Sequence, residues 1–392
     1  MVNSIKRFFK NIILWFFSLF PIDHNKIMFE SNSEIKDNSK NVFIECLKND
    51  LNNKYKIYWA VDDVNRYADE YKNFKNVFFV KKSKKNSYSI MFLYHCCTAK
   101  FCFYTHLFIR LRKTGGQKKI FLTHGVPIKD TRGLFWNPYL NTNIISTSKY
   151  AAKLRCKTFG GGEDIVNILG FPRNDNLFKP EEKTKQYLKK KKYNKVIIWL
   201  PTFKHFNLSS AKRNDYAGNE LKDISLLSNK FISEVNDILK KRNALLLIKF
   251  HPAQNLKYVD FFNLSNVVTM TNTDLEEKKL DLYSLMGLSD ALITDYSSVY
   301  IDYLLLNKPI GFELNDYESY SKGRGFIVDN PFELMPGNKI TNKEEFITFI
   351  NNVLDNKDEF KIERNKVLKK MHKYKDGNSS ERVLKFFNLI NK

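Results

Sequence analysis

Short, continuous apolar runs recur along this chain, and most of them end in a polar turn. Several consist of β-branched and aromatic residues without polar alternation, which is typical of strands buried on both faces of a parallel sheet. Longer helical stretches separate the runs, as crossover helices do. The pattern therefore predicts an α/β protein with parallel sheets. The predicted strands are residues 27–30, 56–60, 76–80, 100–104, 119–123, 143–146, 166–169, 195–200, 244–250, 267–270, 291–294 and 309–313.

The length of the chain and its most charged segment indicate two domains. The 392 residues are too many for one compact core and suit two domains of about 150–200 residues each. Segment 179–195, which contains PEEKTKQYLKKKKYNK, is the most charged stretch and lies near the middle. We therefore predict one domain at 21–180, a second at 195–361, and a helical segment at 362–392.

The charge and the cysteines limit the class of partner and the compartment. The formal net charge of +23 predicts attraction to nucleic acid, an anionic membrane surface or a phosphate-rich substrate. A nucleic-acid binder would need a recognisable module with aromatic and basic residues interleaved, and the sequence contains none, so we expect no nucleic-acid partner. The five cysteines form no CxxC pair, which supports neither a disulfide framework nor a zinc site and favours a reducing cytoplasm.

Residues 1–20 are predicted to form a membrane-interfacial helix. The uninterrupted apolar run at 12–17 is far shorter than the roughly 20 residues that a spanning helix needs. Lys6, Arg7 and Lys10 precede it, and no small-residue cleavage site follows. The aromatic side chains would lie in the headgroup boundary and the basic ones on anionic lipid. The alternative is a helix that packs on its own domain.

His124 is the first candidate site residue, because it follows the predicted strand 119–123 in the string THGVP. Gly125 permits a close backbone approach, and Pro127 suits the first turn of a helix. Open α/β sheets bind ligands at the carboxyl ends of their strands, and histidine is well suited to proton transfer near neutral pH. A histidine in this place can also merely cap a turn, so the motif alone leaves both roles open.

His251 repeats this arrangement in the second half of the chain, where His-Pro follows the predicted strand 244–250. A single histidine at a strand end is weak evidence of a site. One in each half, both at strand ends, predicts that the two histidines face a shared cleft.

Asp295, Ser297 and Ser298 form the third signature, in the string ITDYSS, where a strand ends and a helix begins. The free N–H groups of a helix start, the serine hydroxyls and the helix dipole together favour a bound anion. Asp and Ser are also preferred N-caps. A cap needs only one of them, so the additional hydroxyls favour a phosphate site.

Taken in order, these motifs resemble those of the CDP-glycerol:glycerophosphate transferases of teichoic acid synthesis. The string THGVPIK at 123–129 resembles their His-Gly-Thr-Pro-Leu-Lys signature, with Val in place of Thr. ITDYSSVYID at 293–302 matches their most specific motif. The other matches are GFPRND at 170–175, LPTFK at 200–204, KFHP at 249–252, KPI at 308–310, RGF at 324–326 and DGNSSER at 376–382. Lys204 stands where the family has Arg, and because Lys cannot make a bidentate phosphate contact, its role stays open.

The resemblance implies a GT-B enzyme, with two Rossmann-like domains whose parallel sheets face a central cleft. The first domain would bind the acceptor, the second would bind the CDP donor, and the last helix would cross back to the first. An acceptor hydroxyl would displace CMP from CDP-glycerol or CDP-ribitol. The implied residue roles are His124 as general base, His251 with Ser297 and Ser298 on the donor diphosphate, Asp295 as organiser of that turn, and Arg173 on a donor or acceptor phosphate.

The resemblance also implies a lipid-linked or polymeric glycan acceptor and a peripheral enzyme on the cytoplasmic face of the bacterial plasma membrane. No Asp-x-Asp motif lies at a strand end, and Asp62-Asp63 falls in a loop, so we expect no metal ion or other cofactor. Two alternatives remain. One is a GT-B glycosyltransferase that uses a nucleotide sugar for capsule or lipooligosaccharide synthesis. The other, an inactive scaffold, would show damaged motifs, but both histidines and both serines are present.

Overall fold

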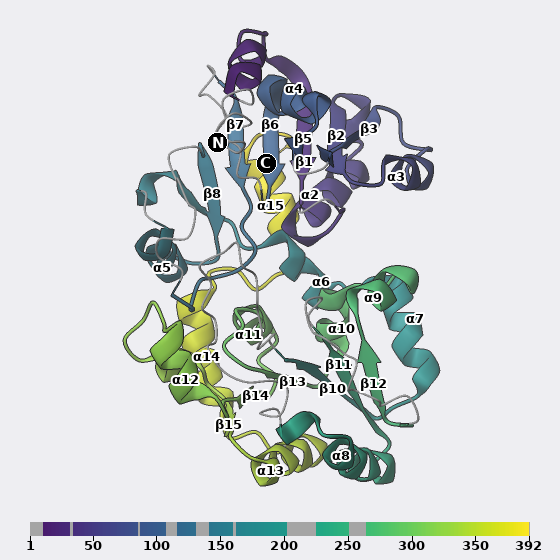
Figure 1. Cartoon of the computed structure of the whole chain (residues 1–392), viewed down its shortest axis with the longest axis vertical. Helices are drawn as coiled ribbons and strands as arrows, with labels where there is room; N and C mark the ends of the chain where they lie inside the picture. Colours follow the sequence, from purple (N-terminus) through teal and green to yellow (C-terminus); the bar gives the residue numbers. More distant parts are fainter. Residues whose placement is uncertain are drawn as a thin grey trace. The chain divides into compact units, whose positions relative to one another are not determined.

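The computed structural model describes residues 11–31, 34–84, 87–106, 116–130, 141–159, 162–201, 225–250 and 264–391 (Figure 1). The chain divides into two compact units. Unit 1 comprises Met1–His124, Gly133–Asp175 and Asn378–Lys392, and unit 2 comprises Gly125–Arg132 and Asn176–Gly377. The chain therefore changes unit after His124, Arg132, Asp175 and Gly377, and all of these except Arg132 belong to a motif of the sequence.

Unit 1 is built on a parallel sheet. Within the described residues this sheet has seven strands in the order β3-β2-β1-β6-β7-β8-β9. The strands are β1 (Asp23–Glu30), β2 (Lys56–Val61), β3 (Val77–Lys81), β6 (Ala99–Tyr104), β7 (Lys118–Phe121), β8 (Asn143–Ser146) and β9 (Val166–Ile168). The described part also contains a short antiparallel hairpin, β4 (Ser83–Lys84) and β5 (Ser87–Tyr88).

An aromatic ladder across the middle of this sheet shows why the strand register holds. Phe29 of β1 is paired with Trp59 of β2 on one side and Phe103 of β6 on the other. Its ring stacks on both, with centroids 5.1 and 5.2 Å apart. All three side chains are fully buried, and a slip of one residue would turn each of them to the other face of the sheet.

Unit 2 is built on a second parallel sheet. In the part of the chain that the structure describes, its six strands follow the order β12-β11-β10-β13-β14-β15. They are β10 (Lys195–Leu200), β11 (Ala244–Lys249), β12 (Val267–Met270), β13 (Ala291–Thr294), β14 (Ile310–Glu313) and β15 (Asn338–Ile340). In the core, Trp199 of β10 and Phe231 both contact the ring of Phe346.

Helices connect consecutive strands of the two sheets, as parallel pairing requires, and in the described part of the chain three more helices follow the last strand. The helices of unit 1 are α2 (Asp37–Lys48), α3 (Val64–Glu70), α4 (Ile90–Thr98), α5 (Lys149–Phe159) and α15 (Ser379–Phe386). After α6 (Asp175–Phe178), which begins at the unit boundary, unit 2 has α7 (Glu182–Lys191), α8 (Asn229–Lys241), α9 (Asn272–Glu277), α10 (Leu282–Leu288), α11 (Val299–Tyr303), α12 (Tyr317–Gly323), α13 (Lys343–Leu354) and α14 (Lys361–Met371).

The strand predictions are confirmed, since each predicted range overlaps a strand of one of the two parallel sheets. The sequence pattern missed β15 and the β4–β5 hairpin. The charged segment that we predicted as the domain junction contains α7, and the boundary between the compact units lies before it, at Asp175.

The carboxyl-terminal segment contributes to both units. α14 belongs to unit 2, whereas α15 belongs to unit 1 and packs against α2 (Figure 1, where α15 is yellow and α2 purple). Arg382 of α15 donates a hydrogen bond to the carbonyl of Leu169, 2.8 Å away. Phe387 contacts the rings of Phe101 and Phe103, so this segment forms part of the core of unit 1.

Residues 11–17 are helical and have two different faces. Leu14 is buried in a cluster with Phe92 and Cys96 of α4, whereas Trp15 and Phe16 are 51% and 50% exposed. One face therefore packs on unit 1 and the other presents aromatic side chains to solvent. The basic residues before position 11 lie outside the described residues. Among the described helices, none has the length and apolar character needed to cross a membrane.

Candidate functional site

Four segments of unit 1 bring polar side chains to one edge of its sheet. Asp37 and Asn38 come after β1, His106 after β6, His124 after β7 and Arg173 after β9. Because these strands are parallel, their carboxyl ends lie along the same edge, where α/β sheets bind ligands. We call these five residues the histidine cluster.

The turn that carries His124 has an unusual backbone. Thr123 has φ +55° and Gly125 has φ +145°, so residues on both sides of the histidine adopt positive φ. A β-branched residue at positive φ is strained, at a cost of about 1–3 kcal/mol, and persists only where the surrounding structure holds it. The side chain of His124 is exposed, so this turn presents the imidazole at the surface of unit 1.

The side chain of Asn38 binds the backbone of this turn. Its Nδ2 donates to the carbonyl oxygens of Leu122 and Thr123, each 2.9 Å away. Its Oδ1 accepts a hydrogen bond of 3.0 Å from the backbone N–H of Arg173. Asn38 is fully buried, and it connects two turns that are far apart in the sequence.

His106 stacks on His124, with ring centroids 4.7 Å apart and an angle of 17° between the planes. Its backbone N–H donates to Oε2 of Glu30 at 3.0 Å, and its Nδ1 lies 2.8 Å from Oγ1 of Thr105. Glu30 also accepts a hydrogen bond from Lys82, and both partners of this ion pair are buried. The buried ion pair between Glu30 and Lys82 therefore holds His106, the residue whose ring stacks on His124.

Asp37 and Arg173 form an ion pair within the cluster, with Arg173 Nη1 2.9 Å from Asp37 Oδ1. Burial acts to raise the pKa of Asp37, but Arg173 opposes it, together with His124, His106 and the N–H of Asn38. The result is a pKa below the usual value. Asp37 is thus charged at neutral pH and keeps the guanidinium of Arg173 beside the histidines.

The environment of His124 favours the neutral imidazole. Burial against the surrounding protein is the largest cause, and with the neighbouring His106 it lowers the pKa of His124 to about 4. Arg173 and Arg155 act in the same direction, whereas Asp37 opposes them. Because part of the side chain remains exposed, a neutral imidazole is accessible to a reactant.

Asp175, the last residue of the GFPRND motif, has a structural role in this chain. Its carboxylate accepts hydrogen bonds from the backbone N–H groups of Ser379 and Ser380, at 2.7 and 2.8 Å. It therefore caps the first turn of α15 and connects two of the points where the chain changes units. Gly170, at φ +82°, faces the same turn, and a Cβ there would lie 2.4 Å from Oγ of Ser379.

In unit 2, Asp295 organises the turn that follows β13. The residue is buried, and its Oδ1 accepts a 2.9 Å hydrogen bond from the N–H of Ser297. Ser297 and Ser298 are partly exposed. The helix that begins there, α11, ends at Tyr303 and continues as the 3₁₀ turn Leu304–Leu306. Such a short helix has a small dipole, so an anion there would depend on the hydroxyls and the first free N–H groups.

Other motif residues of unit 2 stabilise the fold. Asp302 is buried and accepts a 2.7 Å hydrogen bond from the hydroxyl of Tyr283. Lys308 donates to the carbonyl oxygens of Gly287 and Ser289, at 3.0 and 2.5 Å. These contacts fasten α10 to the elements around β13.

The segment after His124 pairs with the RGF motif. Gly125–Arg132 belongs to unit 2, where the N–H of Asp130 donates to Gly325 at 3.0 Å and the N–H of Ile327 donates to Ile128 at 2.9 Å. Two motifs distant in sequence thus pair through their backbones.

His251 and Lys204 lie outside the described residues, so the structure does not test their predicted roles. The strands before and after them are described. β11 and β13 lie on either side of β10, and their carboxyl ends share one edge of the sheet. The prediction that His251 and the Asp295 turn act together therefore stays a prediction.

Sequence reasoning missed Asn38 and His106. Neither belongs to a motif that we recognised, yet each comes soon after a predicted strand, at 27–30 and 100–104. A search for every polar residue within a few positions of a strand end would have found His106. The contacts of Asn38 depend on the shape of two distant turns, and no local pattern signals them.

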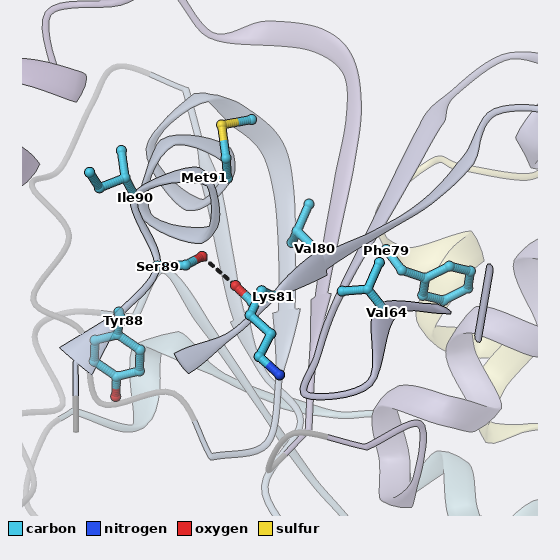
Figure 2. A pocket seen from close by; sticks show the side chains of 8 residues that line it. All are labelled: Val64, Phe79, Val80, Lys81, Tyr88, Ser89, Ile90 and Met91. Carbon is cyan, nitrogen blue, oxygen red and sulfur yellow. Dashed lines mark hydrogen bonds between the residues drawn. The ribbon is translucent and has the colours of Figure 1, made fainter. Parts of the chain in front are cut away.

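A pocket elsewhere in unit 1 contains none of the predicted site residues. It has a volume of about 550 Å³ and lies between the end of β3 and the start of α4 (Figure 2). Its lining side chains are mostly apolar, and two of its lining residues are linked by a hydrogen bond from Ser89 to the carbonyl of Lys81. Among the described residues, no group of three or more His, Cys, Asp or Glu side chains could hold a metal ion.

A family model described as CDP-Glycerol:Poly(glycerophosphate) glycerophosphotransferase matches residues 12–388. The chain belongs to this family. The teichoic acid glycerol-phosphate primase of Bacillus subtilis (strain 168) is 29% identical over 245 residues, 62% of this chain and 56% of that protein. In Bacillus spizizenii (strain ATCC 23059 / NRRL B-14472 / W23), the teichoic acid poly(ribitol-phosphate) polymerase is 27% identical, covering 94% of this chain and 57% of that protein. The teichoic acid poly(glycerol phosphate) polymerase of the same organism is 25% identical, and the match covers 87% of this chain and 86% of that protein.

The chain thus spans little more than half the length of the first two relatives. Among solved structures, the wall teichoic acid polymerase TagF has a TM-score of 0.72 at 20% identity, covering 99% of this chain and 96% of that one. At this identity the likeness concerns the fold alone. It confirms the predicted fold class, an α/β protein of the GT-B type with two parallel sheets. The cleft predicted between the sheets stays a prediction.

Proposed function

We propose that this protein transfers a polyol phosphate, either glycerol phosphate or ribitol phosphate, from a CDP-polyol to a hydroxyl of a membrane-linked cell-surface glycan or teichoic acid, releasing CMP. The family match over residues 12–388 carries this proposal. The relatives named as glycerol-phosphate and ribitol-phosphate primases and polymerases support it. In this proposal unit 1 binds the acceptor and unit 2 binds the donor.

In the proposed reaction, the acceptor hydroxyl attacks the phosphorus that carries the polyol. The bond between that phosphorus and the oxygen of CMP breaks, and CMP leaves with the electron pair. His124 accepts the hydroxyl proton, since its lowered pKa keeps the imidazole neutral and its side chain is exposed. A bound diphosphate adds negative charge, which raises the pKa of His124 and makes the ring a stronger base.

The donor diphosphate would bind in unit 2. The partly exposed hydroxyls of Ser297 and Ser298, in the turn that Asp295 shapes, would donate to its oxygens, and His251 would add a further donor. Arg173 would neutralise a donor or acceptor phosphate from its place beside Asp37. These groups stabilise charge that develops on phosphate oxygens during transfer.

We further propose that the reaction needs no metal ion or other cofactor. Cationic side chains and the N–H groups of a helix start supply charge stabilisation that a metal would otherwise supply. The expected result is that full activity persists in excess EDTA. A loss that Mg²⁺ or Mn²⁺ restores would contradict this part of the proposal.

The protein would act at the cytoplasmic face of the membrane as a peripheral enzyme. The exposed side chains of Trp15 and Phe16, on a helix whose other face packs on unit 1, suit insertion into the headgroup region. The net charge of +23 favours an anionic surface.

A donor panel tests the proposed function. The purified protein is incubated with a lipid-linked teichoic acid acceptor and, separately, with CDP-glycerol, CDP-ribitol and UDP-sugars, and released nucleotide is separated by chromatography. The proposal predicts acceptor-dependent release of CMP from at least one CDP-polyol. Release of UDP from a sugar donor, with both CDP-polyols inert, would establish the competing glycosyltransferase function instead.

A further inference from the structure

Asn38 is the residue whose contacts link two separate parts of the histidine cluster. It lies in the first turn of α2 and is fully buried. Both hydrogen-bond directions of its amide are used: Nδ2 donates to two carbonyls, and Oδ1 accepts from a backbone N–H. All of these partners are backbone atoms of turns at the carboxyl edge of the unit 1 sheet.

The two carbonyls belong to the strained turn. Leu122 and Thr123 immediately precede His124, and Thr123 has φ +55°. Free of its hydrogen bonds, this turn would relax toward a common backbone conformation, and the imidazole would move with it. The amide of Asn38 is therefore placed to hold the backbone angle that sets the direction of His124.

The third hydrogen bond reaches the other side of the cluster. The backbone N–H of Arg173 donates to Oδ1 of Asn38 at 3.0 Å, and the guanidinium of Arg173 binds the adjacent Asp37 at 2.9 Å. Two consecutive residues of α2 thus hold Arg173 by its main chain and by its side chain. An amide is the side-chain group that offers two donors and an acceptor together.

We propose that Asn38 is a positioning residue, which fixes the general base His124 and the cation Arg173 relative to one another. This inference rests on the proposed function, in which His124 takes the acceptor proton. Asn38 itself is buried and touches no substrate. Its effect on the reaction is transmitted through the two turns that it holds.

Asn52 provides a matched control. It is another buried asparagine of unit 1, and its Nδ2 donates to the carbonyl of Lys75 at 3.1 Å, on a turn away from the cluster. Asn52→Ala removes a buried amide and one side chain to backbone hydrogen bond, whereas Asn38→Ala removes a buried amide and three such bonds. Comparison of the two variants separates a loss of stability from a loss of alignment.

Kinetics on the full chain test the proposal. Asn38→Ala is expected to lower kcat about 10–100-fold at temperatures far below its melting temperature, because a displacement of about 1 Å can cost about 10²-fold. Asn52→Ala is expected to stay within about twofold of the wild type. Asn38→Asp keeps the acceptor for Arg173 but loses both donors to the His124 turn, so it should lower kcat nearly as much as Asn38→Ala. If Asn38→Ala does not fold, the kcat of Asn38→Asp alone tests whether Asn38 positions His124.

A double variant shows whether the effect passes through His124. In the His124→Ala background, adding Asn38→Ala should reduce the residual rate much less than Asn38→Ala reduces the wild-type rate, since one of the two positioned groups is absent. Full additivity, or wild-type kcat in both Asn38 variants, would overturn the proposal. Inactivity of the wild type toward every CDP-polyol would count against the proposed function instead.

If the wild type is inactive toward every CDP-polyol, a measurement without substrate still tests the positioning role of Asn38. Histidine ¹³Cε1–¹H spectra follow the seven histidines through a pH titration, and a His124 variant assigns the signal. Asn38→Ala should raise the pKa of His124 toward its usual value of about 6.5, because the freed ring moves into water. The same titration curve in wild type and Asn38→Ala would show that Asn38 does not position this ring.

Discussion

His106 lies against His124 with its ring nearly parallel, at a centroid distance of 4.7 Å. The stacking covers one face of the His124 imidazole, and a positive charge on His106 would disfavour a second one on its neighbour. Both effects lower the pKa of His124 and favour the neutral form, which is the form that can accept a proton. His106 therefore helps to keep His124 neutral, although sequence reasoning identified only one of the two histidines.

Replacement of His106 should change the pH dependence of the reaction. His106→Ala uncovers the ring of His124, so the pKa of His124 rises toward about 6.5 and the acid limb of kcat/KM moves to higher pH. His106→Phe keeps a stacked ring, so its acid limb should stay closer to that of the wild type. Rate profiles between pH 4 and 9 make the comparison, and an unmoved limb in His106→Ala would show that His106 does not tune the base.

The serines of the unit 2 turn should control donor binding. Ser297→Ala with Ser298→Ala is expected to raise the donor KM, since each hydrogen bond to a charged group contributes about 1.5–3 kcal/mol. Ser228→Ala is the matched control, because Ser228 caps α8 by accepting from the N–H of Phe231 in the same unit. Calorimetry with the CDP-polyol measures the affinity. Equal donor affinity in the double variant and the wild type would show that the two serines do not bind the donor and that the motif only caps a helix.

The fold could be predicted from the sequence because its signal is local. A buried strand of a parallel sheet is a continuous apolar run, as ALIT at β13 and VIIWL within β10 illustrate. β15 was missed because two of its three residues, Asn338 and Lys339, are polar and only partly buried, so NKI forms no such run. The change of units at Asp175 depends on which segments contact each other and not on composition, and the predicted domain bounds stay a prediction.

The site could be predicted only in part. His124 was found because a histidine at a strand end before Gly-x-Pro is a local pattern. The Asp37–Arg173 ion pair joins residues 136 positions apart, and that pairing follows from the order of strands in the sheet. Thr123 adopts positive φ, a conformation that a β-branched residue does not predict. The sequence therefore offers no reason to expect that Asn38 holds this turn.

Asp175→Ala should destabilise unit 1 and release α15. The variant loses two buried hydrogen bonds to a carboxylate, which together contribute roughly 3–6 kcal/mol. Asp274→Ala is the control, since Asp274 also accepts two hydrogen bonds from Thr271 and a third from Lys278, but at the partly exposed start of α9, where water can replace it. A thermal melt with limited proteolysis should show early cleavage near α15 in Asp175→Ala only. Equal melting of both variants would contradict the structural role of Asp175.

The two faces of the amino-terminal helix should respond differently to substitution. Trp15→Ser with Phe16→Ser changes exposed side chains, so it should weaken flotation with anionic liposomes and leave the melting temperature nearly unchanged. Leu14→Ala opens a cavity in the cluster with α4, so it should lower the melting temperature, at a cost of about 2–5 kcal/mol. Unchanged flotation of the Trp15/Phe16 variant would leave the helix as a packing element of unit 1.

The central claim is that this protein moves a polyol phosphate and that His124 takes the acceptor proton. Time-resolved ³¹P NMR of the wild type with a CDP-polyol and a soluble acceptor analogue tests it most directly, because diphosphate, CMP and phosphodiester give separate signals. The account predicts that CMP and a new phosphodiester grow at equal rates as the diphosphate disappears. His124→Ala should slow both about 10²–10⁴-fold, while calorimetry shows donor affinity near that of the wild type. Release of CMP without a phosphodiester, or more than a tenth of wild-type turnover in His124→Ala, would contradict the account.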